Sequence, residues 1–393
     1  MMNYQRQIVA RLEDALLSGP PLLQVVTGPR QVGKTTAAEQ LSQRLGWPGI
    51  FEAADVSPPP GPEWIETHWT RARALPSRPA LLVLDEVQKV RGWSETVKRL
   101  WDEEKRSRKP LSVILLGSSA LQLREGMSES LAGRFFLHRC MHWSLGECAE
   151  AFGWGLDQWI FFGGYPGAAR LAKRQDDWAA YISDSLIETA LARDVFQMHT
   201  VAKPALLRAL FGCAAAHPAQ IFSYNKMLGQ LVDAGNTTTL AHYLDLLETA
   251  YLASGLPLFS AGAPRRRAGS PKLILWNNAL INAFCGRHFS EARQDSAWWG
   301  RLIENAVGAH LLNGLPPSRY AVSYWREGGD EVDFVVTRGT SLWAIEVKSG
   351  RSGKAAGLAA FRERKPRAKI LLVGPGGIPL EEFFRSPPET WLQ

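Results

Sequence analysis

The first 143 residues alternate between a helical and a strand-like pattern of apolar positions. Ile8, Leu12 and Leu16 recur at four-residue steps, which predicts an amphipathic helix over residues 4–17. Short apolar runs follow, with helical stretches such as residues 93–108 between them. Strands that alternate with helices predict an α/β fold with a parallel sheet covered by helices. The runs are residues 22–28, 49–55, 80–86, 111–119 and 134–143.

The middle of the chain loses the strand-like runs and becomes helical. A helix over 223–232, a turn at Gly235–Asn236 and a second helix have the spacing of a helix-turn-helix. Two short apolar strands, over 256–260 and 272–276, then bracket a loop that carries three arginines, Arg265, Arg266 and Arg267. We therefore expect a helical lid over residues 144–200 and a winged helix over 201–278.

The last third has a different order, in which a long helix precedes three consecutive strands. A further helix and a further strand follow, so residues 279–393 are expected to form an αβββαβ domain. Together with a first domain over residues 1–143, these patterns divide the chain into four regions. The helices are predicted over 298–312 and 354–365, and the strands over 321–327, 331–338, 341–348 and 368–374.

A glycine-rich segment between the first apolar run and the next helix fits the pattern GxxxxGK[ST] at every fixed position. Such a P-loop curls its backbone N–H groups around phosphates at the start of a helix. Lys34 is expected to reach the β- and γ-phosphates, and the Thr35 hydroxyl to ligate Mg²⁺. The residues expected to bind the nucleotide are Gly28, Pro29, Arg30, Gln31, Val32, Gly33, Lys34, Thr35 and Thr36, with Asp85.

An acidic pair, Asp85–Glu86, ends the third apolar run. Beside a P-loop, Asp85 can hold the hydration shell of Mg²⁺, and Glu86 can polarise the attacking water. Ser118 or Ser119, at the end of the next run, can orient that water. The sequence therefore predicts an ATPase that uses ATP and Mg²⁺, with Glu86, Lys34 and Ser118 as catalytic residues.

Several segments together resemble the AAA-type (AAA+) ATPase module of a prokaryotic family whose C-terminal domain has no known function. They include GPRQVGKTT (28–36), LLVLDEVQ (81–88), ILLGSS (114–119) and SLAGRFF (130–136), followed by HWSLGE, GGYPG, LARDV and the C-terminal strands. The resemblance implies a homo-oligomeric ring, such as a hexamer, in which one subunit's arginine completes the neighbour's site. It points to Arg134. Arg124 and Arg193 are the alternatives, and each of the three arginines could instead be an ordinary ion-pair residue.

A second set of acidic residues lies in the last region. Asp333 and the tripeptide Glu346-Val-Lys348 fall on neighbouring predicted strands, and Glu304 falls on the preceding helix. Carboxylates and a lysine at strand ends can bind a divalent cation and steady a hydroxide that attacks a phosphodiester. The arrangement resembles the PD-(D/E)xK nuclease superfamily, which implies a second Mg²⁺ or Mn²⁺ at this site. Because such folds also persist as inactive binding modules, the sequence does not decide whether this domain cleaves a phosphodiester.

Charge is distributed unevenly along the chain, whose net charge is +7. Residues 1–155 hold 19 basic and 17 acidic side chains, residues 156–260 hold 7 and 9, and residues 261–393 hold 19 and 12. The last region therefore carries the surplus, which favours contact with the phosphates of DNA through Arg351 and Lys354 and the arginine loop. A solvated helix face and a protein-binding winged helix are the alternatives.

Composition limits the class of protein further. A hydrophobic content of 46% excludes a disordered chain, and four cysteines without a CxxC pair favour a reducing compartment. Neither a signal peptide nor a long apolar run is evident, so we expect a cytoplasmic protein without a membrane partner. The expected function is an ATPase that remodels DNA, as in branch migration or junction processing. The alternatives are an ATP-gated switch that binds a protein and an ATP-regulated nuclease.

Overall fold

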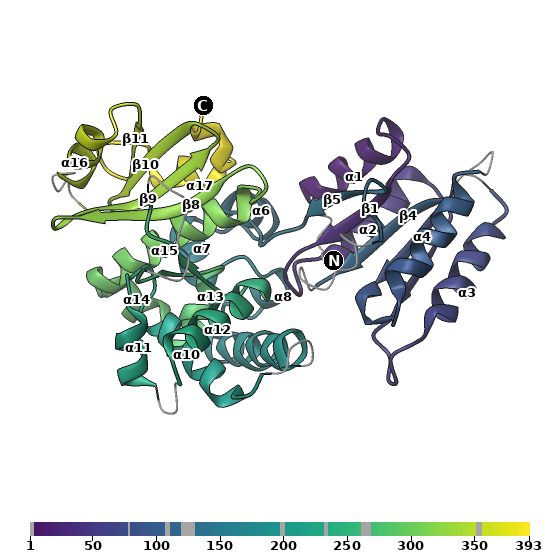
Figure 1. Cartoon of the computed structure of the whole chain (residues 1–393), viewed down its shortest axis with the longest axis horizontal. Coiled ribbons are helices and arrows are strands. Elements are labelled where there is room, and N and C mark those ends of the chain that lie inside the picture. Colours follow the sequence, from purple (N-terminus) through teal and green to yellow (C-terminus); the bar gives the residue numbers. More distant parts are fainter. Residues whose placement is uncertain are drawn as a thin grey trace. The chain divides into compact units, whose positions relative to one another are not determined.

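The computed structural model describes residues 4–77, 79–106, 111–118, 130–196, 201–231, 235–260, 269–350 and 356–393. The chain divides into two compact units, Met1–Met141 (unit 1) and His142–Gln393 (unit 2), which are shown in Figure 1. None of the helices in these segments combines the length and the apolar character needed to cross a membrane.

Unit 1 contains a five-stranded parallel sheet in the order β2-β3-β4-β1-β5. The prediction of an α/β fold with a parallel sheet is confirmed, and the arrangement is consistent with a P-loop NTPase-like domain. The strands are β1 Leu23–Thr27, β2 Gly49–Ala53, β3 Leu81–Asp85, β4 Ser112–Gly117 and β5 Phe135–Arg139. The helices are α1 Gln7–Leu17, α2 Lys34–Leu45, α3 Pro62–Arg73 and α4 Trp93–Glu104, with a short 3-10 turn, η1, at Val87–Lys89.

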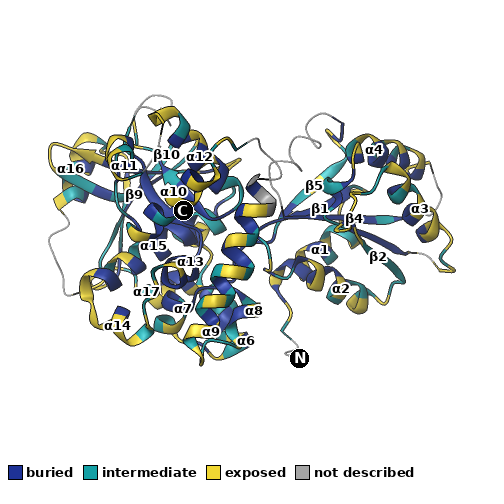
Figure 2. Cartoon of the chain, turned by 90° about the horizontal axis from the view of Figure 1, so that it is seen from below, coloured by how far each residue is buried: buried dark blue, intermediate teal, exposed yellow. Residues whose placement is uncertain are grey.

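Both faces of this sheet are covered, because alternate strand residues enter different cores. Val25 of β1 belongs to a core with Trp69 of α3 and Val97 of α4. Its neighbour Val26 belongs to a second core with residues of α1 and α2 such as Leu41. In Figure 2, β1 is dark blue along its length, whereas α2 and α4 carry yellow on their outward sides. The layered arrangement leaves the ends of the strands as the place for polar chemistry.

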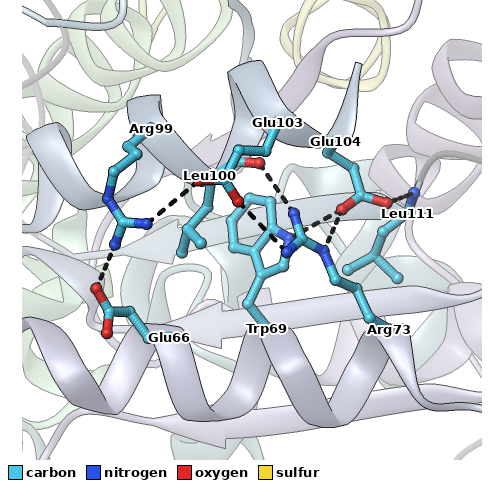
Figure 3. Close-up of polar contacts among 8 residues, drawn as sticks. All are labelled: Glu66, Trp69, Arg73, Arg99, Leu100, Glu103, Glu104 and Leu111. Carbon is cyan, nitrogen blue, oxygen red and sulfur yellow. Dashed lines mark hydrogen bonds and ion pairs between the residues drawn. The ribbon is translucent and has the colours of Figure 1, made fainter. Parts of the chain in front are cut away.

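A buried carboxylate joins α3 to α4. Glu104 accepts hydrogen bonds from Trp69 Nε1 (3.2 Å), Arg73 Nε (2.7 Å) and the backbone N–H of Leu111 (2.9 Å) (Figure 3). Burial alone would raise the pKa of Glu104, but these donors, Arg73 first among them, hold it below its usual value. The contacts fix the two helices on one face of the sheet.

Unit 2 begins with a series of helices, and an open sheet lies in its last part. The order αβββαβ predicted for the last region is present as α15, β8, β9, β10, α16 and β11. Its helices are α6 Leu145–Phe152, α7 Leu156–Phe162, α8 Pro166–Ala169, α9 Gln175–Ala180, α10 Pro204–Ala216, α11 Tyr224–Gln230, α12 Thr237–Thr249, α13 Asn278–Cys285, α14 Phe289–Gln294, α15 Ser296–Gly314, α16 Ala356–Arg364 and α17 Leu380–Arg385. Wider helical turns, η2 and η3, cover Tyr181–Ile187 and Ala190–Phe196, and a 3-10 turn, η4, covers Pro388–Trp391. The strands are β6 Ala253–Leu256, β7 Lys272–Leu275, β8 Ala321–Glu327, β9 Asp330–Arg338, β10 Ser341–Val347 and β11 Lys369–Val373.

Buried asparagines tie together segments of unit 2 that lie far apart in the sequence. Asn278 Nδ2 donates to the carbonyls of Ile160 (2.8 Å) and Leu302 (2.9 Å). Asn305 Nδ2 donates to Leu275 O and to Asn278 Oδ1, both at 2.9 Å. These bonds join α7, β7, α13 and α15, so the boundaries expected after residues 200 and 278 fall inside one compact unit.

The four-stranded sheet of unit 2 has the order β11-β10-β9-β8. A two-stranded hairpin of β6 and β7 lies beside it, in contact with α15 and β8. The first hairpin strand was expected at 256–260 but occupies 253–256, because the following residues pair with β8 instead: Phe259 N–H donates to Tyr324 O (2.6 Å), and Tyr324 N–H donates to Pro257 O (3.1 Å). The hairpin therefore presents the start of β7 to the sheet.

Candidate functional site

The P-loop occupies the turn between β1 and α2, as the sequence predicts (Figure 1). At Gly28 a side-chain Cβ would lie 1.9 Å from the carbonyl oxygen of Cys140, so no larger residue fits there. Gly33 has a φ of 91°, which L side chains rarely adopt, and α2 begins at the next residue, Lys34. The chain thus turns tightly into the helix, leaving the helix N-terminus available for phosphate oxygens.

Lys34 is buried and lies over the turn that precedes it. Its Nζ donates to Gly28 O (3.0 Å) and Pro29 O (2.8 Å). Burial lowers the pKa of Lys34, although Glu86, Cys140 and Asp85 act in the opposite direction. Because both acceptors are neutral carbonyls, an arriving phosphate would give the ammonium an anionic partner.

The two residues expected to ligate Mg²⁺ lie together. Thr35 Oγ1 donates to Asp85 Oδ2 at 2.5 Å, and Asp85 Oδ1 accepts from the Glu86 N–H at 2.8 Å. Thr35 is the second residue of α2 and Asp85 ends β3, and β4 separates β3 from β1 in the sheet. The carboxyl ends of neighbouring parallel strands meet at one edge, which explains how residues 50 positions apart make contact.

Glu86 has an unusual backbone and a restrained side chain. Its φ of 52° and ψ of 35° are left-handed values that are uncommon for a residue other than glycine. Oε2 accepts from Ser118 Oγ (3.0 Å) and from Gln88 Nε2 (2.6 Å). Ser118 was predicted to lie here, whereas Ser119 falls outside the described residues. Gln88 was not predicted, since a polar residue after an acidic pair carries no distinguishing pattern.

Arg6 is a second residue that the sequence analysis missed. It is buried, and it donates to Val32 O of the P-loop (2.9 Å), to Cys140 Sγ (3.2 Å) and to Met141 O (3.0 Å). An arginine in this place ties the P-loop to the segment that follows β5. A lone arginine before a helix gives no sequence indication of such a role.

Arg134, the residue suggested for the neighbour's site, is paired within its own unit. Its Nε and Nη2 donate to the two carboxylate oxygens of Asp102 on α4, at 2.9 and 3.0 Å. This bond from Arg134 holds the pKa of Asp102 below its usual range. Of the alternatives, Arg124 and the side chain of Arg193 lie outside the described part of the chain. A role for Arg134 in trans would require it to exchange Asp102 for a nucleotide.

The carboxylates of the last region also come together, but around a lysine. Lys272, the first residue of β7, places Nζ 2.5 Å from Glu304 Oε1, 3.3 Å from Asp333 Oδ1 and 3.6 Å from Glu331 Oε1. Lys348 Nζ donates to Glu346 Oε1 at 2.6 Å. We call these six residues the carboxylate–lysine cluster. Within the described segments, no group of three or more His, Cys, Asp and Glu side chains is arranged to hold a metal ion.

The residues expected to contact DNA all lie outside the described residues: Arg265, Arg266, Arg267, Arg351 and Lys354. Two other basic side chains of the same region are described. At the end of α16, Arg364 lies 5.4 Å above the Trp325 ring and forms an ion pair with Glu327 (3.2 Å). Lys369 on β11 lies 5.7 Å from the centre of the Trp343 ring. Both side chains are thus engaged with the sheet.

Three segments of the chain match known families. Residues 21–149 match a family described as AAA domain. Residues 153–291 and 299–379 match two families described as domains of unknown function, DUF8612 and DUF4143. No curated protein matches the chain. The first match, with the parallel sheet and the P-loop, supports an AAA-type ATPase domain in unit 1 and implies ATP with Mg²⁺ as its ligands.

Proposed function

We propose that unit 1 hydrolyses Mg-ATP and that the chain uses this reaction to remodel DNA bound through unit 2. The 2.5 Å contact between Thr35 Oγ1 and Asp85 Oδ2 carries the first half of the proposal, because it joins the P-loop to the acidic pair at the end of β3. Thr35 and Asp85 would hold Mg²⁺, which supplies positive charge beside the phosphates when it is bound.

Each residue of the site has a defined task in this proposal. Backbone N–H groups of residues 28–36, except Pro29, bind the phosphates, and Lys34 exchanges its two carbonyl partners for phosphate oxygens. Glu86 accepts a proton from the attacking water. Ser118 orients the Glu86 carboxylate by donating to its Oε2. Gln88, bound to the same oxygen, restrains Glu86 further.

Replacing the general base tests the hydrolytic reaction. We expect Glu86→Gln to bind ATP but to turn it over about 100-fold more slowly or worse, since general-base catalysis typically contributes at least that factor. Release of phosphate and equilibrium binding of a fluorescent ATP analogue measure the two properties. Glu39→Gln, an exposed position on the adjacent helix, is the matched control and keeps normal turnover. Normal hydrolysis by Glu86→Gln would refute the assignment.

Mixing two inactive variants tests whether Arg134 acts on a neighbouring subunit. Arg134→Ala and Glu86→Gln each lack a different part of one shared site, so a mixed oligomer contains some complete sites. We expect the mixture to recover part of the turnover that each variant lacks alone. Asp102→Asn, which frees Arg134 from its partner in the same chain, keeps turnover. No recovery in a mixture shown to be co-assembled would restrict Arg134 to its pair with Asp102.

The charge surplus of residues 261–393, with 19 basic and 12 acidic side chains, supports DNA as the partner of unit 2. We expect duplex and branched DNA to bind with an affinity that falls steeply as salt rises, and to stimulate ATP turnover. Titrations at two salt concentrations measure both. Slow turnover that no DNA alters, without salt-dependent binding, would favour the alternative of an ATP-gated switch for a protein partner.

A further inference from the structure

Lys272 lies where three elements of unit 2 converge. Its side chain is 0% exposed. It extends from the start of β7 to Glu304 of α15 and to Glu331 and Asp333 of β9. The backbone carbonyl of Asp333 also accepts from Nζ, at 3.2 Å. The ring of Phe334 lies 5.0 Å from Nζ. The ammonium is therefore enclosed by acceptors and by an aromatic face.

We propose that Lys272 supplies the cation of this carboxylate–lysine cluster, in the place where a nuclease of the PD-(D/E)xK type would hold a divalent metal ion. Unit 2 is then a module that does not cleave phosphodiesters. The inference goes beyond the proposed function, since it concerns residues that take no part in ATP hydrolysis.

The first argument is that the oxygens a metal would need already have partners. Glu304 Oε1 and Asp333 Oδ1 face Lys272. Asp333 Oδ2 accepts from the Val347 N–H at 2.8 Å, and Glu346 Oε1 accepts from Lys348 Nζ. Glu346 Oε2, by contrast, is the one buried carboxylate oxygen of the cluster that has no hydrogen-bond partner among the described residues. One oxygen is too few for Mg²⁺ or Mn²⁺, which take several oxygen ligands in near-octahedral geometry.

The second argument is electrostatic. Burial alone would lower the pKa of Lys272, but Glu304 and Asp333 raise it by more, so the ammonium stays charged. A divalent ion bound to Glu304 Oε1 at about 2.1 Å would lie within about 5 Å of this buried charge. Repulsion at that distance is strong where water does not screen it.

The third argument is that Lys272 cannot readily swing away. Its backbone is held in the hairpin with β6, where Lys272 pairs with Leu256, and in a bridge to Ile221. Since none of the side chain reaches solvent, an outward rotamer would have to displace packed neighbours. The Lys272 side chain therefore stays within the cluster and does not move out to make room for a metal ion.

Binding of Mn²⁺ to the full-length chain, measured by electron paramagnetic resonance without nucleotide, tests the proposal directly. We expect wild type, Asp333→Asn and Glu346→Gln to bind equally weakly, because no metal uses these carboxylates. Supercoiled plasmid with Mn²⁺ should be nicked no faster by wild type than by Asp333→Asn. Tight binding that Asp333→Asn or Glu346→Gln abolishes, or nicking that depends on Asp333, overturns the proposal.

Removing the lysine gives the complementary measurement. In Lys272→Ala the carboxylates lose their cation, so we expect Mn²⁺ affinity to rise at least about 10-fold, and to fall again when Asp333→Asn is added. A folded Lys272→Ala chain that gains no affinity shows that these carboxylates do not form a cation site, and so overturns the proposal. If Lys272→Ala does not fold, the comparison of wild type with Asp333→Asn decides. Neither readout uses ATP, so failure here is separate from failure of the ATPase proposal.

Discussion

Each unit buries a lysine, and the two lysines differ in their partners. Lys34 donates to two neutral carbonyls, and its pKa is lowered. Lys272 faces three carboxylates, and its pKa is raised. Burial is common to both, so burial alone does not indicate a role. A buried ammonium whose partners are neutral can pair with an anionic ligand, whereas one that is already paired with carboxylates stabilises the fold.

The largest effect that separates the two lysines is on ATP turnover. We expect Lys34→Met to lower turnover by roughly 100- to 1,000-fold, because a donor aimed at developing charge is lost. The free energy of unfolding should change by only about 1.5–3 kcal/mol, the size of a hydrogen bond made by a charged group. Phosphate release and urea unfolding measure the two quantities. An unfolding midpoint that collapses in Lys34→Met would show that this lysine is structural as well.

The reverse result is expected for the second lysine. Lys272→Met leaves the carboxylates of the cluster without their cation, which typically costs about 3–5 kcal/mol of folding free energy. ATP turnover by the folded protein should stay normal, since Lys272 has no place in the P-loop site. Lys226→Met, at an exposed position of unit 2, is the control and should leave stability unchanged. Urea unfolding of both variants provides the measurement.

A double variant sharpens this test. Adding Glu304→Gln to Lys272→Met removes one of the buried acidic groups that lost its partner, so part of the lost stability should return. Coupling between groups in contact typically lies between about 0.5 and 3 kcal/mol. Strictly additive losses would mean that Lys272 stabilises unit 2 by packing and not through its charge.

The same two lysines show what could be predicted from the sequence. The P-loop was found because its pattern is contiguous: Gly28, Gly33 and Lys34 lie within one turn, and their spacing alone specifies the geometry. The parallel sheet followed from the alternation of short apolar runs with helices. These features depend on residues that are close together in the sequence, so they can be predicted from it.

Lys272 has no such local pattern, because it begins an apolar strand that was interpreted as one arm of a winged helix. Its partners are far along the chain, Asp333 being 61 positions away. The sequence did identify Glu304, Asp333 and Glu346 as a group, yet it gave no sign that a fourth element inserts an ammonium among them. The ammonium enters this group of carboxylates only because the fold brings the start of β7 next to α15 and β9.

The smallest expected effect concerns two buried histidines, one in each unit, that have neutral partners as Lys34 does. His138 Nε2 lies 2.7 Å from Gln24 Oε1, and His310 Nε2 lies 3.0 Å from Ser386 O. Burial lowers the pKa of both to about 4. Between about pH 6.5 and pH 4 the unfolded chain therefore binds protons that the folded chain does not, so stability falls as the pH falls.

Replacing either histidine with glutamine removes that histidine's contribution to the pH dependence of stability. Between pH 7.5 and pH 5 we expect His138→Gln and His310→Gln each to lose about 2 kcal/mol less stability than wild type. The figure follows because pH 5 lies roughly 1.5 units below the pKa of a free imidazole, and each unit corresponds to about 1.4 kcal/mol. Urea unfolding at both pH values measures the difference. Similar results in the two units would show that burial acts alike in both, leaving the partners as the cause of the contrast between Lys34 and Lys272. A histidine whose replacement leaves the pH dependence unchanged would be protonated within the fold and would need an anionic neighbour.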